Sequence, residues 1–423
     1  MFFLVLKVEP KKCQLKLHLS PPPNKLLHAK IKITGSKSES NRLLLLQALY
    51  PTIEIENLSN SDDAEVMQKG LQIKNGTVDI HHAGTAMRFL TSYFASQDRK
   101  QVLLTGSQRM TERPIGVLVD SLRSLGANIE FEQDEGYPPL KIKGTKLAKS
   151  KVSIPANISS QYISSLLMIG SSLPNGLELE LVGKITSVPY IKMTLSLLDQ
   201  IGVQNSFDGN MITVAPKTSV RKTNLVVESD WSSASYFYSI AALSEVGSEI
   251  TLSSYKKNSL QGDSVLSEIY KDLGVETDFK ENEIVLKKVA ECKLSMLECE
   301  LSNAPDTAQT IAVTCFGLGM GCNLTGLHTL KIKETDRLEA LNTELSKLGS
   351  EISVTDKSLT ILPSKEIKEG IAIDTYNDHR MAMAFAPLAM KKSLIINDAG
   401  VVSKSYPDFW SDLKDLQFDI ENL

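Results

Sequence analysis

A short unit of apolar spacing recurs along the chain. In its clearest copy, apolar residues fall every three or four positions from Ile115 to Leu125, as on one face of a helix, and Gly126 follows as a left-handed stop. Two alternating apolar segments come next, around Ile129 and Ile142. The pattern predicts a helix followed by two short strands.

Three further copies end at Gly202, Gly274 and Gly349, so the marker glycines lie about 75 residues apart. Asp208-Gly209 is a strong hairpin signal in the second copy, and a weaker copy falls near residues 67–80. This period is too long for a solenoid repeat and fits a compact α/β module. Such units favour sheets whose helices pack together inside. Ordinary α+β domains with chance similarity are the alternative.

Composition narrows the class of protein. A length of 423 residues predicts two or three domains, and 42% hydrophobic with 23% charged residues is typical of a globular protein. The net charge of -4 argues against a nucleic-acid coat or a membrane-surface protein. No apolar run approaches the ~20 residues of a membrane helix. The apolar start precedes its lysines, the wrong order for a secretory signal.

The cysteines are odd in number and form no Cys-x-x-Cys pair, which predicts reduced, mostly buried thiols in a cytoplasmic protein. A metal site built from them is disfavoured, because no histidine lies at ligand spacing beside them. The five are Cys13, Cys292, Cys299, Cys315 and Cys322.

Four short runs set Lys or Arg among residues typical of turns and helix starts, namely residues 35–42, 84–88, 333–337 and 377–380. Arg binds carboxylate and phosphate through its planar fork, and Lys binds them as a point charge. Because the chain as a whole is slightly acidic, we interpret these cations as positioned for binding and not as a result of composition. They indicate a substrate, or a pair of substrates, with several negative charges.

The first and third runs each predict a helix start. Residues 35–38 would form an anion cradle around Lys37, although they lack the first glycine and full spacing of a phosphate loop, which disfavours nucleotide hydrolysis. Thr335 is expected to cap the next helix, with Arg337 in its first turn against the helix dipole. A solvated Lys and a surface Arg–Glu pair are the alternatives.

Two more runs have the character of helix N-termini. Residues 377–384 are polar and then small and apolar, which predicts a buried helix whose start faces a site; His379 alone would more often be structural. Ser159-Ser160-Gln161 is both a helix cap and a candidate anion contact. Ser232-Ser233 is an equally plausible cap, but a strongly apolar helix follows it.

Together these runs resemble the enolpyruvyl transferases, from about residue 30 to residue 410. The resemblance also covers residues 61–63, 112–116, 258–263 and 305–306. It implies an α/β fold with two domains, each an inside-out α/β barrel, built from six repeated βαβαββ-like units. One domain would comprise residues 1–35 and 229–423 and the other residues 36–228. The active site would lie between them, and the domains would close over the substrates.

The implied reaction transfers the enolpyruvyl group of phosphoenolpyruvate to the 5-hydroxyl of shikimate 3-phosphate and releases phosphate, a step of aromatic amino acid biosynthesis. It needs no cofactor and no metal, and the expected protein is a cytoplasmic monomer. Two alternatives are the family branch that acts on UDP-N-acetylglucosamine and a catalytically inactive anion-binding relative. The first is disfavoured because the loop 107–113 has no cysteine, the second because the charged residues are all present.

The resemblance also implies roles for particular residues. The acid–base residues would be Lys37, Asp306 and Glu334. The phosphoenolpyruvate contacts would be Lys37, Gly84, Arg113, Gln161, Arg337, Arg380 and Lys404. The shikimate 3-phosphate contacts would be Ser38, Arg42, Ser159, Ser160, Gln161, Ser187, Tyr190, Asp306 and Lys333. The chain departs from many relatives at His82, Phe89, Val188 and Thr329, which concerns substrate contacts rather than the chemistry.

Overall fold

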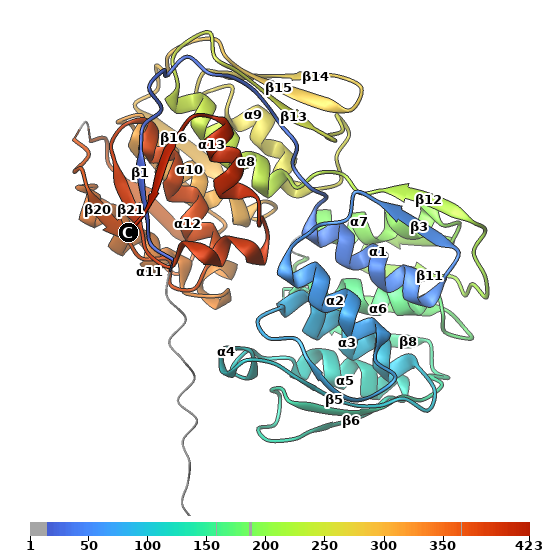
Figure 1. The fold of residues 1–423 in the computed structure, drawn as a ribbon. Helices are drawn as coiled ribbons and strands as arrows, with labels where there is room; N and C mark the ends of the chain where they lie inside the picture. The colour runs from blue at the N-terminus through green and yellow to red at the C-terminus, as the bar shows by residue number, and fades with distance from the viewer. Residues whose placement is uncertain (1–14, 158, 186–187, 365) are drawn as a thin grey trace, which may run out of the picture.

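The buried apolar side chains form two separate clusters. The structure, a computed structural model, describes residues 15–157, 159–185, 188–364 and 366–423. One cluster draws on residues 43–227, and the other on residues 17–33 and 231–418. The two groups of elements lie side by side in Figure 1. Within the described residues, no helix combines the length and apolar character that crossing a membrane requires.

The clearest repeat unit contains four strands and two helices in βαβαββ order. Its first two strands are parallel, and its last two form an antiparallel pair whose second strand lies beside the second strand of the unit. The elements are β4 (Asn75–Asp79), α3 (Gly84–Ser96), β5 (Gln101–Thr105), α5 (Gly116–Leu125), β6 (Asn128–Phe131) and β7 (Leu140–Lys143). A one-turn helix, α4 (Gln108–Thr111), precedes α5.

Two other units have the same order of elements, and each is formed by its own continuous stretch of chain. The first contains β8 (Lys151–Pro155), α6 (Ser160–Gly170), β9 (Leu177–Val182), α7 (Val188–Gln200), β10 (Asn205–Asp208) and β11 (Met211–Val214). The second contains β16 (Met296–Glu300), η2 (Pro305–Thr307), α10 (Ala308–Gly317), β17 (Gly321–Thr325), η3 (His328–Ile332), α11 (Arg337–Leu348), β18 (Ile352–Val354) and β19 (Ser358–Ile361).

Two further repeat units each complete a four-stranded sheet with a strand from the N-terminal segment. The first contains β2 (His28–Ile31), α8 (Trp231–Leu243), β13 (Glu249–Ser253), η1 (Gly262–Val265), α9 (Leu266–Ile269), β14 (Val275–Phe279) and β15 (Glu283–Lys288). The second contains β20 (Ile371–Ile373), α12 (His379–Phe385), η4 (Ala386–Met390), β21 (Leu394–Ile396), η5 (Ala399–Lys404), α13 (Phe409–Asp415), β22 (Asp419–Asn422) and β1 (Leu17–Ser20). Strand β1 lies between β21 and β22.

The remaining sheet has two strands. Strand β3 (Ile53–Glu56) pairs in parallel with β12 (Thr223–Val226), and it lies between α1 (Lys37–Leu49) and α2 (Asp62–Gln72). The described residues thus contain five four-stranded sheets and one two-stranded sheet. The predicted α/β fold with repeated units is confirmed, with one unit lacking its hairpin.

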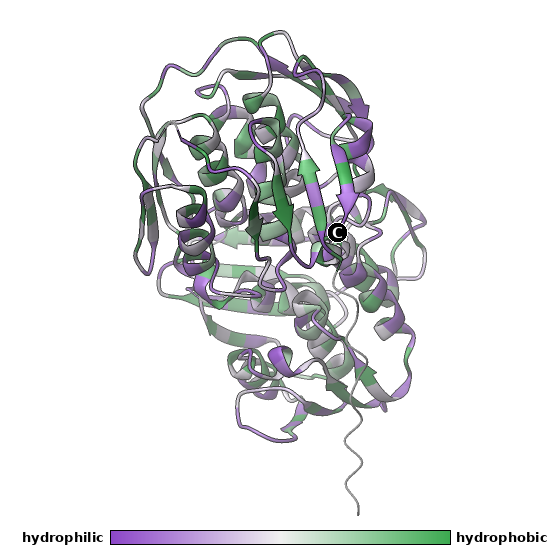
Figure 2. Cartoon of the chain, turned by 60° about the vertical axis from the view of Figure 1, so that its left-hand side comes forward, coloured by the Kyte–Doolittle hydropathy of each residue, from purple (hydrophilic) through white to green (hydrophobic). Residues whose placement is uncertain are grey.

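All four marker glycines have the left-handed conformation that was predicted, but only Gly126 and Gly349 cap their helices directly; α7 ends at Gln200, and α9 already ends at Ile269, before Gly274. Gly126, Gly202, Gly274 and Gly349 have φ of 108°, 76°, 81° and 100°, the left-handed region in which side chains with a Cβ are disfavoured. Inner helices are buried along their length, since α3 is buried from Gly84 to Ala95 and every residue of α10 is buried. Buried and exposed residues alternate along β7 and β8, and Figure 2 shows purple and green residues together on several strands.

The chain crosses between the two clusters twice, and the crossings are bonded to each other. Gly35 and Ser229 form an antiparallel bridge, and the Ser36 amide donates to the Glu228 carbonyl at 2.7 Å. A Cβ on Gly35 would lie 1.9 Å from the Asn57 carbonyl oxygen, so only glycine fits there. The start of α1 is thereby held beside the start of α8.

Two helix-cap predictions are wrong. The N-cap of α11 is Asp336 rather than Thr335, because its carboxylate accepts from two amides, those of Leu338 and Glu339, at 3.1 and 3.2 Å. The N-cap of α8 is Asp230 rather than Ser232 or Ser233. Carboxylates suit these positions because they also favour the positive end of the helix dipole. The four cysteines that the structure describes are free thiols, with Cys315 and Cys322 buried; Cys13 lies outside the described residues.

The carboxyl of Glu39 at the crossing predicts an unusual pH dependence of stability. It is buried in the first turn of α1 and accepts the Glu228 amide at 3.2 Å. Burial first, and the Glu228 charge in addition, raise its pKa to about 7. Because the folded state keeps a proton that the unfolded state loses above its ordinary pKa, stability falls as pH rises toward 7. Integrated at 1.36 kcal/mol per pKa unit, the loss is about 3 kcal/mol.

We therefore expect Glu39→Gln to stabilise the protein at pH 8 and to change little at pH 4.5. Urea unfolding at both pH values measures the difference. Glu245→Gln, at an exposed side chain, is the matched control. An effect of Glu39→Gln that is equal at both pH values would contradict the titration of this carboxyl.

Candidate active site

A cavity of about 520 Å³ is lined by residues of both clusters. It contains most of the residues singled out in the sequence: Lys37, Ser38, Arg42, Gly84, Arg113, Ser159, Ser160, Gln161, Tyr190, Asp306, Lys333, Glu334, Arg337 and Arg380. Lys404 lines an adjoining recess that it shares with Arg113 and Glu334. Ser187 lies outside the described residues.

A buried guanidinium organises one wall of the cavity. Arg337, at the start of α11, is 1% exposed, and its fork meets three carboxylates. Its Nε lies 2.7 Å from Asp378, Nη1 lies 2.8 Å from Asp306 and Nη2 lies 2.9 Å from Glu334. Burial alone lowers the pKa of Arg337, but the three carboxylates raise it above its ordinary value. Arg337 therefore holds the three acids in place.

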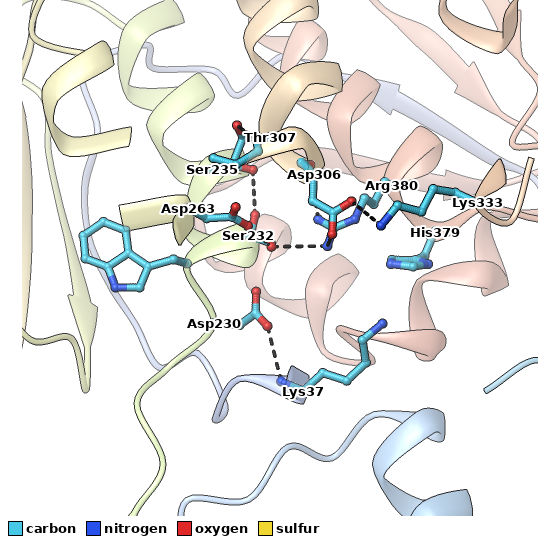
Figure 3. A network of polar contacts seen from close by, with 12 residues as sticks. Lys37, Asp230, Ser232, Ser235, Asp263, Asp306, Thr307, Lys333, His379 and Arg380 are labelled. Atoms are coloured by element: carbon cyan, nitrogen blue, oxygen red, sulfur yellow. Dashed lines mark hydrogen bonds and ion pairs between the residues drawn. The ribbon is translucent and has the colours of Figure 1, made fainter. Parts of the chain in front are cut away.

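Asp306 is the most heavily compensated of these acids. Besides Arg337, its carboxylate meets Lys333 at 3.4 Å and Arg380 at 3.2 Å. Burial raises the pKa of Asp306, but Arg380, Lys333 and Arg337 together hold it well below the usual range. Figure 3 shows Lys333 and Arg380 reaching this carboxylate from different sides. Asp306 is therefore ionised and can accept a hydrogen bond from a ligand.

Glu334 is ionised for a similar reason. Burial raises its pKa, whereas Arg337 above all, and then Arg113 and Lys37, hold it well below the ordinary value. Its carboxylate lines both the main cavity and the recess. A ligand in the cavity can therefore meet two ionised carboxylates.

Lys37 lies across the cavity at the start of α1. Its backbone amide donates to Asp230 at 3.3 Å, as Figure 3 shows, and its ammonium lies 3.6 Å from Asp63 in the first turn of α2. Burial raises the pKa of Asp63, while Lys37 lowers it. The sequence alone does not predict a role for Asp63, although the run 61–63 is part of the family resemblance.

Arg42 belongs to the framework of the cavity floor. Its nitrogens donate to Thr194, to the Ser38 carbonyl and to Ser164 at 2.8, 2.8 and 2.9 Å. Its guanidinium also lies 5.8 Å from the ring centre of Tyr190. Burial lowers its pKa to about 10, which leaves it charged at neutral pH. Arg42 thus supplies positive potential while its donors hold neighbouring side chains.

Two helix N-termini meet at the same end of the cavity. Ser159 caps α6 by accepting the Gln161 amide at 3.3 Å, as the sequence predicted. The Gln161 side chain donates to Thr85, in the first turn of α3, at 3.0 Å. Helix N-termini present amide donors and positive potential, so this end of the cavity suits an anion.

Arg113 and Gly84 face each other here. A Cβ on Gly84 would lie 2.6 Å from Nη1 of Arg113, so a larger residue would displace the guanidinium. Within the part of the chain that the structure describes, no hydrogen bond or ion pair engages the Arg113 side chain. Lys404, in contrast, donates to Asn377, at 2.5 Å to its carbonyl and 3.0 Å to its side chain. Arg113 is thus ready to bind an anion.

The sequence favours a structural role for His379, but the structure places this residue in the lining of the cavity. Both ring nitrogens are buried without a hydrogen-bond partner among the described residues. Burial first, and then the charge of Lys37, hold its pKa well below the ordinary value, so the ring is neutral. The sequence also did not assign Asp378, Ser232 or Asp263 to the site. Asp378 belongs to the motif 377–380 and Asp263 to the motif 258–263, so these two motifs were the available signals.

The chain is similar to known proteins over most of its length. Residues 67–413 match the family model described as EPSP synthase (3-phosphoshikimate 1-carboxyvinyltransferase). A 3-phosphoshikimate 1-carboxyvinyltransferase of Bacteroides fragilis is 45% identical over 399 residues, 93% of this chain and 97% of the relative. One of Photobacterium damsela subsp. piscicida is 36% identical and covers 94% and 99%. The structure of EPSP synthase from Acinetobacter baumannii superposes with a TM-score of 0.79 at 21% identity, covering 96% and 100%, which shows a shared fold.

Proposed function

The chain belongs to the EPSP synthase (3-phosphoshikimate 1-carboxyvinyltransferase) family, and we propose from this premise how its cavity performs the family's reaction. The enzyme, of class EC 2.5.1.19, transfers the enolpyruvyl group of phosphoenolpyruvate to the 5-hydroxyl of shikimate 3-phosphate and releases phosphate. The observation that carries the mechanism is the cavity in which cations from both clusters surround two ionised carboxylates. Two highly charged anions can meet there because the cations offset their repulsion.

Each substrate has a matching set of donors. Shikimate 3-phosphate is placed against the N-terminus of α6, with Arg42 beneath it and with Ser38, Ser159, Ser160, Gln161, Tyr190, Asp306 and Lys333 around its ring and phosphate. Ser187, which the resemblance assigns to the same ligand, lies outside the described residues. Phosphoenolpyruvate is placed among Lys37, Gly84, Arg113, Gln161, Arg380 and Lys404, with Arg337 behind the carboxylates. The unoccupied fork of Arg113 supports this second placement.

The chemistry needs one proton to move twice. As the 5-hydroxyl oxygen bonds to C2 of the enolpyruvyl group, its proton passes to Glu334, either directly or by way of Asp306, and the protonated Glu334 then gives this proton to the methylene carbon. Lys37 then protonates the bridging oxygen as the bond from C2 to the phosphate oxygen breaks. The methyl carbon then returns its proton to Glu334, which restores the double bond, and Glu334 becomes a carboxylate again by passing this proton to the neutral Lys37. The intermediate is tetrahedral and is never attached to the protein.

We further propose that residues 1–35 with 229–423 and residues 36–228 act as two domains that close over the substrates. The paired crossings at Gly35 and Ser229 support this division, because the chain passes between the clusters only there in the described ranges. A bound anion contacts cations of both halves, which favours the closed state. The protein is expected to act on these small molecules as a monomer in the cytoplasm.

Phosphate release from phosphoenolpyruvate, measured with each acceptor in turn, tests the proposal. Release that depends on shikimate 3-phosphate is expected. Release with UDP-N-acetylglucosamine would favour the sister branch, and no release with either acceptor would favour an inactive anion-binding relative.

Loss of Arg113 or Arg380 is expected to weaken phosphoenolpyruvate binding more than shikimate 3-phosphate binding. Removing one charged hydrogen-bonding partner typically costs about 1.5–3 kcal/mol. Calorimetric titration of Arg113→Ala and Arg380→Ala with each ligand measures this. Arg99→Ala, at a side chain that is 92% exposed, serves as control. Equal losses for both ligands would contradict the placement.

A further inference from the structure

A carboxylate behind the cavity is connected to Arg380 through a serine hydroxyl. Asp263, in η1, is 4% exposed, and one of its oxygens accepts the hydroxyl proton of Ser232. The Ser232 oxygen in turn accepts from Nη2 of Arg380 at 3.2 Å. Figure 3 shows Ser232 between Asp263 and Arg380, and the same Nη2 also donates to Asp306 at 3.2 Å. Arg380 is therefore held between one direct carboxylate and one indirect one.

The segment that carries Asp263 is fixed to the start of α8. The Gln261 side chain accepts the Trp231 amide at 3.0 Å and donates to the Ser229 carbonyl at 2.8 Å. A Cβ on Gly262 would lie 2.3 Å from the Asn303 carbonyl oxygen, so the backbone fits closely there. Asp263 and Ser232 consequently keep one relative position.

The Asp263 carboxylate is held at an energetic cost. Its other oxygen is buried without a hydrogen-bond partner among the described residues. The charged and titratable groups that face it are Asp306 from η2, Asp230 at the start of α8, Arg380 from α12 and Tyr190 from α7. Buried polar atoms are normally satisfied, so one that is not requires an explanation. The hydrogen bond to Ser232, and through Ser232 the contact with Arg380, explains why a carboxylate is kept at this buried position.

We propose that Asp263 is a positioning residue that acts through Ser232 to hold the Arg380 guanidinium in the orientation that receives phosphoenolpyruvate. An ionised Asp263 keeps the Ser232 hydroxyl pointing toward itself, which leaves a serine lone pair for Arg380. This inference rests on the proposed function of Arg380 as a phosphoenolpyruvate contact.

The same geometry makes the effect depend on pH. Burial first, and then the Asp306 charge, raise the pKa of Asp263 to about 6, although Arg380 lowers it. A protonated Asp263 loses its charge and donates its own proton to the Ser232 oxygen, which makes that oxygen a weaker acceptor for Arg380. Affinity for phosphoenolpyruvate should therefore fall as pH falls through about 6.

Asp263→Asn and Ser232→Ala test the inference by calorimetric or fluorescence titration. At pH 7.5 each is expected to raise the dissociation constant for phosphoenolpyruvate about 5–20-fold, the effect of one weakened charged hydrogen bond. Affinity for shikimate 3-phosphate should change less than twofold. Ser232→Thr, which keeps the hydroxyl, should stay close to the parent. The double variant should be no worse than the worse single variant, because both changes remove the same contact.

The ratio of dissociation constants between Asp263→Asn and the parent provides the readout that a merely structural role would not move. It should fall toward one at pH 5, and the ligand's own ionisation cancels in the ratio. Additive single effects, or a ratio that stays constant with pH, would overturn the inference. If Asp263→Asn does not fold, as judged by shikimate 3-phosphate binding, Ser232→Ala with Ser232→Thr decides. If Arg380→Ala itself leaves phosphoenolpyruvate binding unchanged, the proposed function of Arg380 fails instead.

Discussion

Glu334→Gln is expected to lower the turnover number by a factor of about 10² or more while substrate binding stays nearly intact. The amide has the size of the carboxylate and can still accept from Arg337, whose Nη2 lies 2.9 Å from Glu334. It cannot take up and return a proton. Binding relies on cations elsewhere in the cavity, so the loss should fall on the chemical step.

Steady-state kinetics with both substrates varied would measure this, and calorimetry would check binding. Glu339→Gln is the matched control, because Glu339 is an exposed residue in the first turn of the same helix, α11. Turnover of Glu334→Gln close to that of the parent would remove Glu334 from the mechanism and leave Asp306 as the acid–base residue.

Arg337→Met is expected to destabilise its half of the molecule by about 3–5 kcal/mol, the usual cost of removing one partner from a buried ion pair. Methionine fills part of the space but leaves Asp378, which is 0% exposed, without its 2.7 Å partner. Asp306 retains Lys333 and Arg380. The unpaired charges of Asp378 and Glu334 should therefore dominate the loss.

Tryptophan fluorescence during urea unfolding would report on the relevant half. Both tryptophans of the chain, Trp231 and Trp410, lie in or against the cluster that contains α11. Arg337→Lys keeps a charge without the fork and should fall between parent and methionine variant. The deficit should shrink at low pH, where the freed carboxylates take up protons. A loss below about 1 kcal/mol would mean that the buried ion pairs contribute little net stability.

The repeat could be found in the sequence because it ends at positions with a strict backbone requirement. Gly126, Gly202, Gly274 and Gly349 all need positive φ, and each is followed by a hairpin that is continuous in the chain. The unit that contains α13 was missed because its antiparallel pair joins β22 to β1, from opposite ends of the sequence. The copy near residues 67–80 was weak because α2 is followed by the first strand of the next unit.

The cations of the site could be predicted, but their partners could not. Lys37 and Arg380 stood out in runs of turn-forming residues, the family resemblance added Arg113, and all three line the cavity. Asp378 and Asp63 looked like ordinary helix-start carboxylates, and only the packed fold shows that they lie beside Arg337 and Lys37. For the same reason Arg337 resembled an open anion contact, whereas three carboxylates enclose it.

The position of β1 in its sheet also determines when each half of the protein can fold during synthesis. Leu17 is made early, yet its neighbours in the sheet are Ile396 and Asn422. That sheet stays incomplete until nearly the whole chain has emerged, at about 5–20 residues per second. The cluster built from residues 43–227 has all its strands and helices available much sooner. Half of the cavity can thus exist on the nascent chain, whereas the half with Arg337 and Arg380 must await the last strand, so no incomplete chain can carry a finished active site.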